Sequence, residues 1–231
     1  RLASQRLINL KTSTKVSVDA QDKSDDFSIE DPSVYVEPVK KLPASSDEWV
    51  EKVRRWSAEI SKYNGVLHST VNVMLQRETK YMVSSEGTRL QHGRGFARIT
   101  IVAGGKASDG MDLQATDSFE AEDGSRLPKD AVVVAAVNRV GKDISGLLDA
   151  PLVEPFIGPA VLSGRASGVF FHEIFGHRIE GHRQKDPNEG QTFTKSINTK
   201  VLPDFLSVVF DPTRKSIGDV DLNGTYQYDD E

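Results

Sequence analysis

The sequence predicts an α+β protein: an antiparallel β-meander with packed helices, in which a helix carrying a metal motif follows a strand. Two observations lead to this class. Between residues 66 and 120, apolar side chains recur at every second position, the period of strands with one buried face. On either side of that segment, apolar residues recur at the spacing of three and four that is typical of helices. Helix, meander and helix, followed by shorter elements, is an α+β order.

Composition excludes several classes of protein. The 231 residues are enough for one large domain or two small ones. A formal net charge of -5 and a pI of about 5.6 give no electrostatic reason to expect a nucleic-acid partner. No apolar run approaches the roughly 18 residues of a membrane span, so no membrane partner is expected. The absence of cysteine excludes disulfides and thiolate metal ligands within these residues.

The chain divides into a polar lead-in, residues 1–45, and an α+β part, residues 46–231. The lead-in is rich in charge and proline, and we interpret it as a linker or a surface arm. The first helix is expected from about 46 to 63. Ser45 and Glu48 have the spacing of a capping box, and Asn64-Gly65 supplies the stop. Its apolar stripe consists of Trp49, Val53, Trp56 and Ile60.

The meander is expected to contain four or five strands. "HSTVNVMLQ" and "FARITIVAGG" alternate cleanly, whereas "KYMVSS" and "TRLQH" flank a tight turn at Glu86-Gly87. "GMDLQATDSFEA" adds a further strand. The side chains expected to share a face are Val71, Val73 and Leu75 in the first strand, Ala97, Ile99, Ile101 and Ala103 in the central one, and Met111, Leu113 and Ala115 in the last.

A second helix is expected to open at Pro128 and Asp130 and to end before Pro151. Its stripe consists of Val133, Val137, Val140, Ile144 and Leu147. After it come a short strand, "FIGPAVLSG", and a helix from Arg165 to about Gly181 with Ser163 as its cap. The last clear strand is expected in "FLSVVFDPT".

The chemically distinctive segment is "FFHEIFGHRIEGHRQ", residues 171–185, which holds three of the five histidines. We interpret His172 and His177 as metal ligands and Glu173 as the base that takes a proton from water. Zinc suits such a site, because imidazoles bind it well and water bound to it ionises near neutral pH. The same division of labour holds in the H-E-x-x-H metalloproteases.

The spacing of the two histidines makes a prediction about shape. In a straight helix, at ~100° per residue, residues five apart point roughly 140° apart, too far to share one ion. The helix must therefore contain a π-turn or relax just before the second ligand. Gly176 lowers the energy of such an irregularity, because glycine adopts backbone conformations that other residues avoid.

The other polar residues of the segment receive weaker roles. Glu180 is expected either to accept an N–H from a ligating histidine or to pair with Arg183 or Arg178. His182 is expected to face solvent or to support the ligands rather than to bind the ion. The remaining histidines, His68 and His92, fall in or near predicted strands. The competing interpretation is a surface helix whose polar stripe includes all of these groups.

The segment "GVFFHEIFGHRIEGH" resembles the metal-binding segment of the TldD/PmbA metallopeptidases, long described as modulators of DNA gyrase. His172, Glu173 and His177 match the family's H-E-x-x-x-H motif. "VVFDPT" at 208–213 and "YDDE" at the end of the chain are similar to further segments of the family.

The resemblance implies a zinc-dependent peptidase subunit, TldD-like, that acts on peptides or unfolded segments as a homo-oligomer or beside a related subunit. It favours a cytoplasmic location. The family's third zinc ligand is a cysteine of the C-terminal domain, and its members are longer than this chain. We therefore expect a fragment that lacks that domain, holds a two-histidine half-site and is inactive alone. The alternative is a non-catalytic interaction or regulatory module with structural histidines.

Overall fold

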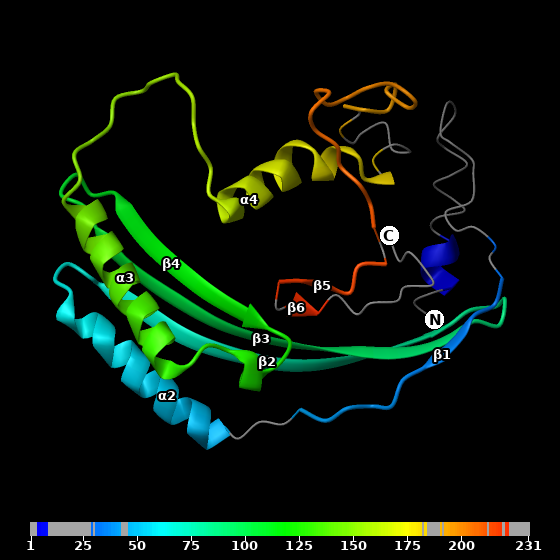
Figure 1. Cartoon of the computed structure of the whole chain (residues 1–231), viewed down its shortest axis with the longest axis horizontal. Coiled ribbons are helices and arrows are strands. Elements are labelled where there is room, and N and C mark those ends of the chain that lie inside the picture. Colours follow the sequence, from blue (N-terminus) through cyan, green and yellow to red (C-terminus); the bar gives the residue numbers. More distant parts are fainter. Residues whose placement is uncertain are drawn as a thin grey trace. The chain divides into compact units, whose positions relative to one another are not determined.

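Figure 1 shows a computed structural model of the chain. The chain forms two compact units. The larger unit contains the described residues of 29–156 and 210–221, and the smaller contains those of 4–8 and 157–209. The boundary after residue 156 lies inside the part that the sequence had suggested to be continuous. The structure describes residues 4–8, 29, 31–42, 46–181, 183, 190, 192–211, 213–218 and 220–221.

The larger unit is built on an open sheet of mixed strand orientation, so the predicted α+β class is confirmed. Its strands are β1 (Val34–Val36), β2 (His68–Val83), β3 (Arg89–Lys106) and β4 (Asp112–Ala121). The last three form the predicted antiparallel meander, while the short β1 pairs in parallel with the start of β3. The predicted turn at Glu86-Gly87 lies between β2 and β3, where Gly87 adopts a φ of 102°.

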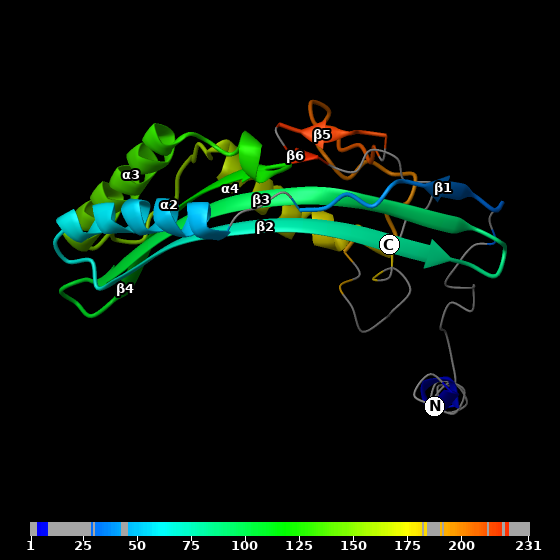
Figure 2. The ribbon, with the colours of Figure 1, turned by 90° about the horizontal axis from the view of Figure 1, so that it is seen from below.

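Fewer strands form than expected, because two predicted strands are continuations of their neighbours. The "KYMV" segment belongs to β2 and "TRLQH" belongs to β3. The two strands pair without interruption from His68 opposite Gly104 to Val83 opposite Arg89. Figure 2 shows this long two-stranded ribbon running beyond the region covered by the helices.

Two helices cover one face of the sheet. Helix α2 (Ser46–Ala58), extended by the 3-10 turn η1 (Glu59–Lys62), packs on β2, and α3 (Asp130–Leu148) packs on β3 and β4. The first predicted helix is therefore confirmed in its extent, although Ser45 of the proposed capping box lies outside the described residues. Among the helices that the structure describes, none has the length and apolar character needed to cross a membrane.

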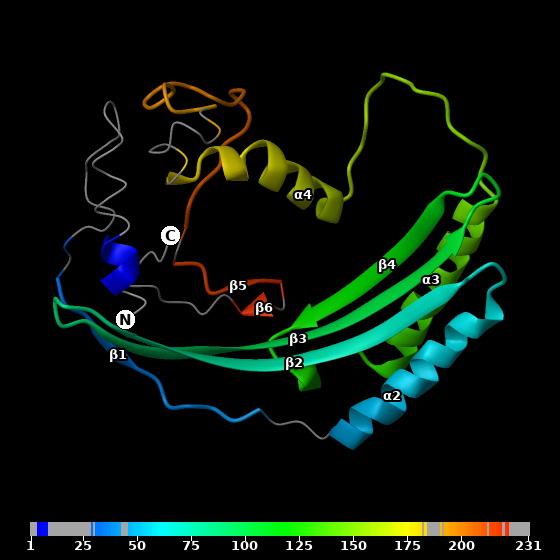
Figure 3. The same cartoon turned by 180° about the vertical axis from the view of Figure 1, so that it is seen from behind.

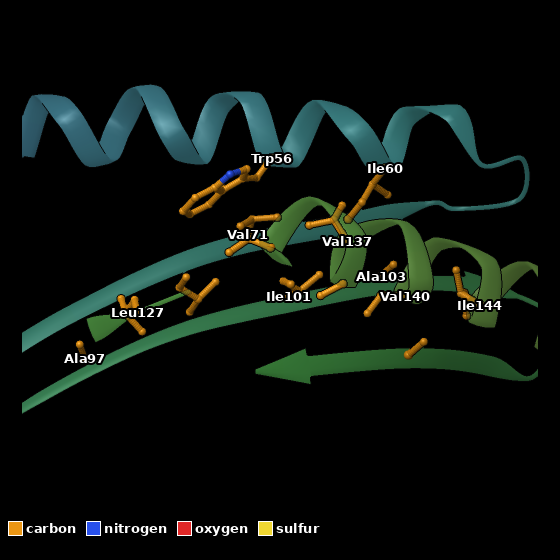
Figure 4. Close-up of a cluster of buried hydrophobic side chains, with 14 of the residues drawn as sticks. Trp56, Ile60, Val71, Ala97, Ile101, Ala103, Leu127, Val137, Val140 and Ile144 are labelled. Carbon is orange, nitrogen blue, oxygen red and sulfur yellow. The ribbon is translucent and has the colours of Figure 1, made fainter. Parts of the chain in front are cut away.

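The core lies between these helices and the sheet (Figure 4). The four apolar residues of β3 that were predicted to share a face are fully buried there, as are Val133, Val137 and Ile144 of α3. Two members of the predicted stripes do not join them. Leu147 is 43% exposed and Leu148 packs on the core in its place, because Leu148 lies four residues after Ile144 and continues its row. Met111 is exposed because it precedes the first residue of β4.

Both late strands predicted from apolar runs are wrong. Residues 151–163, which hold all of "FIGPAVLSG" except its last glycine, contain no regular secondary structure, and the same holds for the described residues of "FLSVVFDPT". Ile157 and Phe205 are almost fully exposed. A strand requires a paired neighbour for its backbone groups, and these runs have none among the described residues. The short strands β5 (Ser216–Ile217) and β6 (Val220–Asp221) pair with each other instead.

The contact between α3 and the end of η1 depends on a glycine. A Cβ at Gly141 would lie 2.3 Å from the ring of Tyr63, and that ring is held by a 2.8 Å hydrogen bond from its hydroxyl to Asn138 Oδ1. We expect Gly141→Ala to lower the free energy of unfolding by about 1–3 kcal/mol through overpacking, despite the better helix propensity of alanine.

Gly146 on the same helix is the matched control, since a Cβ there meets nothing within 4 Å. Gly146→Ala should leave stability unchanged or raise it by up to about 1 kcal/mol. Urea unfolding of the two variants beside the parent chain measures the difference. Equal stability of the two variants would contradict the packing argument.

Candidate metal centre

The helix of the smaller unit begins as predicted and ends early. This helix is α4 (Gly164–Ile174), which Figure 3 shows from behind. It starts after Ser163, whose Oγ accepts a hydrogen bond from Ala166 N at 3.3 Å. The predicted cap is therefore confirmed. The helix had been expected to continue to about Gly181, but Phe175 leaves the helical conformation with φ -126° and ψ -53°.

A tighter turn follows the helix and carries the second histidine. Residues Gly176–Arg178 form the 3-10 turn η3, which is closed by hydrogen bonds from Arg178 N to Phe175 O and from Ile179 N to Gly176 O. Of the two distortions that the spacing allowed, relaxation just before the second ligand is the one that occurs. The ring of Phe193 lies 5.6 Å from that of Phe175 and packs on the residue where the helix breaks.

This break brings the two predicted ligands together. The rings of His172 and His177 lie 4.3 Å apart between centroids, with their planes at 69°. One nitrogen of each ring and one carboxylate oxygen of Glu173 all lie within 4.8 Å of one another. The prediction that both histidines project to the same side of a distorted helix is confirmed.

The donor set fits a zinc ion. Imidazole nitrogens and carboxylate oxygens are common zinc ligands, and ligands at about 2.0–2.1 Å from one ion lie up to roughly 4 Å apart. The ligand atoms of the cluster, all within 4.8 Å of one another, are close to that spacing. The side chains of His172 and Glu173 are 62% and 61% exposed, so an ion and a substrate can both reach them.

Glu180 combines the two roles that the sequence left as alternatives. Its Oε1 lies 2.8 Å from His177 Nδ1, and its Oε2 accepts a 2.6 Å hydrogen bond from Arg183 Nε. The hydrogen bonds from Arg183 and then from His177 lower the pKa of Glu180 to about 2, so it is an ionised acceptor at neutral pH. Arg178 Nη1 donates a 2.9 Å hydrogen bond to the hydroxyl of Thr192.

The other histidines lie elsewhere. His68 and His92 belong to β2 and β3 of the larger unit, as predicted. His182 lies outside the described residues. Sequence reasoning missed Phe193, because nothing in the local pattern links it to Phe175, eighteen residues earlier.

The segment that contains this cluster also matches a known family. Residues 157–231 match the family model described as the PmbA/TldA metallopeptidase C-terminal domain. This segment is therefore similar to a domain of the TldD/PmbA metallopeptidases. The match begins at residue 157, which is also the first residue of the longer segment of the smaller unit, and it includes His172, Glu173 and His177. Comparison with curated proteins and with solved structures found no match.

The match confirms the resemblance for residues 157–231, and the name of the matched domain indicates a metallopeptidase. The matched model is described as a C-terminal domain of the family. The boundary at residue 45 and the expectation of a further C-terminal part outside the chain stay predictions.

Proposed function

We propose that this protein is the catalytic subunit of a zinc-dependent peptidase that cleaves peptides or unfolded segments. His172 and His177 hold the zinc ion, and Glu173 activates the attacking water. The convergence of two imidazoles and a carboxylate across a broken helix, inside the family segment, is the observation that supports this function. The proposal includes a homo-oligomer or a related partner subunit, and a cytoplasmic location.

The two imidazoles supply two of the three protein ligands usual in a catalytic zinc site. A third ligand from another part of the full-length protein, a cysteine by the family resemblance, completes the set. Zinc, when bound, polarises the peptide carbonyl and makes water acidic enough to lose a proton near neutral pH.

Glu173 is suited to the proton transfers. Its carboxylate oxygen lies 3.9 Å from His172 Nε2, beside the expected ion position, and its side chain is open to solvent. In this role it accepts a proton from the attacking water and delivers it to the nitrogen of the departing amine. The exposure of the cluster leaves it accessible to a peptide substrate.

Metal dependence tests the proposal. The full-length protein should hydrolyse a flexible peptide, lose this activity on dialysis against a chelator, and regain it with zinc but not with magnesium, which prefers oxygen ligands. Hydrolysis that survives complete removal of metal would contradict the proposed function.

A further inference from the structure

The two histidines of the cluster are held in different ways. His172 lies within α4, so the helix backbone restricts its side chain. His177 lies in η3, beyond the point at which Phe175 leaves the helix. Its position therefore depends more on side-chain contacts, and its side chain is less exposed than that of His172, at 38% against 62%.

The contact that restrains His177 belongs to a row of three side chains. His177, Glu180 and Arg183 follow one another at intervals of three residues, and the carboxylate of Glu180 lies between the other two. The side chains of Glu180 and Arg183 are 29% and 28% exposed, so this end of the cluster is half-buried. Such charge-assisted bonds are stronger when they are partly shielded from water.

The chemistry of the contact determines which ring nitrogen carries the hydrogen. An ionised carboxylate only accepts hydrogen bonds, so a neutral His177 that bonds Glu180 through Nδ1 must carry its hydrogen there. The lone pair is then on Nε2, which leaves that atom as the one able to bind an ion. Histidines that bind metals commonly donate their other N–H to a carboxylate in this way.

We infer that Glu180, anchored by Arg183, is a positioning residue that fixes His177 in the Nδ1–H tautomer and presents Nε2 as its metal-binding atom. The part of this inference that concerns the ion rests on the proposed function. Arg183 contributes to this positioning of His177. Its hydrogen bond to Oε2 of Glu180 holds the plane of the carboxylate while Oε1 faces the ring. With both oxygens engaged, Glu180 supports a ligand and is not one itself.

Nitrogen NMR of the metal-free 231-residue chain tests the tautomer without reference to zinc or hydrolysis. Spectra taken at pH 8.5, above the ordinary titration range of histidine, distinguish Nδ1–H from Nε2–H rings. The signals of His177 are those lost in His177→Gln. We expect the Nδ1–H form in the parent chain and a shift towards Nε2–H in Glu180→Ala. Arg183→Ala should shift it in the same direction by a smaller amount.

Arg54→Ala is the matched control, since it removes another Arg–Glu pair at a spacing of three, the 2.8 Å contact with Glu51 on α2. It should leave the His177 spectrum unchanged. An Nε2–H ring in the parent chain, or an unchanged ring in Glu180→Ala, would overturn the inference. So would an effect of Arg54→Ala as large as that of Arg183→Ala.

Zinc affinity of the full-length protein tests the second half of the inference. Loss of a residue that orients a ligand typically weakens metal binding about 10–100-fold, and we expect Glu180→Ala to fall in that range. Unchanged affinity in this variant would show that Glu180 does not position the ligand. If the full-length parent bound no zinc while His177 kept the expected tautomer, the zinc proposal would fail and the fixing of the ring by Glu180 would stand.

Discussion

Glu173→Gln in the full-length protein should lower kcat/KM for a flexible peptide by about 10²–10⁴-fold and leave the zinc content unchanged. A neutral amide cannot accept the proton from water, yet it removes neither imidazole. Glutamine is close in size to glutamate, and the side chain is 61% exposed, so the fold should not change. Peptide hydrolysis and metal analysis on the same samples measure both quantities.

Glu154→Gln provides the control for this variant. Glu154 is also exposed, and its replacement by glutamine removes the same negative charge. It lies in the larger unit, outside the cluster of His172, Glu173 and His177. Its activity should equal that of the parent. If Glu173→Gln retained full hydrolysis, Glu173 would have no part in the mechanism.

His172→Ala should lose both the zinc and the hydrolysis. Removal of one imidazole from a site with three protein ligands weakens the hold on the ion directly. Because α4 is exposed along most of its length, loss of the side chain should not unfold the unit. Zinc content after extensive dialysis, together with the peptide assay, gives the result.

His68→Ala is the matched histidine variant, since His68 is an exposed residue at the start of β2. It should retain both zinc and activity. A module with structural histidines predicts a different pattern, with no zinc-dependent hydrolysis to lose and little difference between the two variants. Full zinc retention by His172→Ala would therefore favour that alternative.

Most of the larger unit could be predicted from the sequence. The spacing of apolar residues, two in strands and three to four in helices, indicates which face of an element is buried. The alternation through Ile99 and Ile101 located the buried face of β3, and the stripe through Val137 and Ile144 located that of α3. The errors arose where the pairing of strands determines whether a strand forms. Apolar content alone predicted a strand around Ile157 and another around Phe205, but a strand forms only beside a partner, and local patterns do not identify one.

The candidate site was predictable for a different reason. The five-residue spacing of His172 and His177 conflicts with a regular helix, so the assumption of one shared ion already required a break near Gly176. The partners of Glu180 could not be chosen in the same way, because Arg178 and Arg183 lie at similar distances along the chain. The structure brings Arg183 and His177 to the two oxygens of the same carboxylate.

Anomalous diffraction at the zinc absorption edge, on crystals of the zinc-loaded full-length protein, tests the central claim most directly. We predict one strong zinc peak about 2.0–2.1 Å from a ring nitrogen of both His172 and His177, with Glu173 facing the open side. A peak bound to only one of these histidines, or a zinc ion held by other residues while this cluster stays without metal, would contradict it.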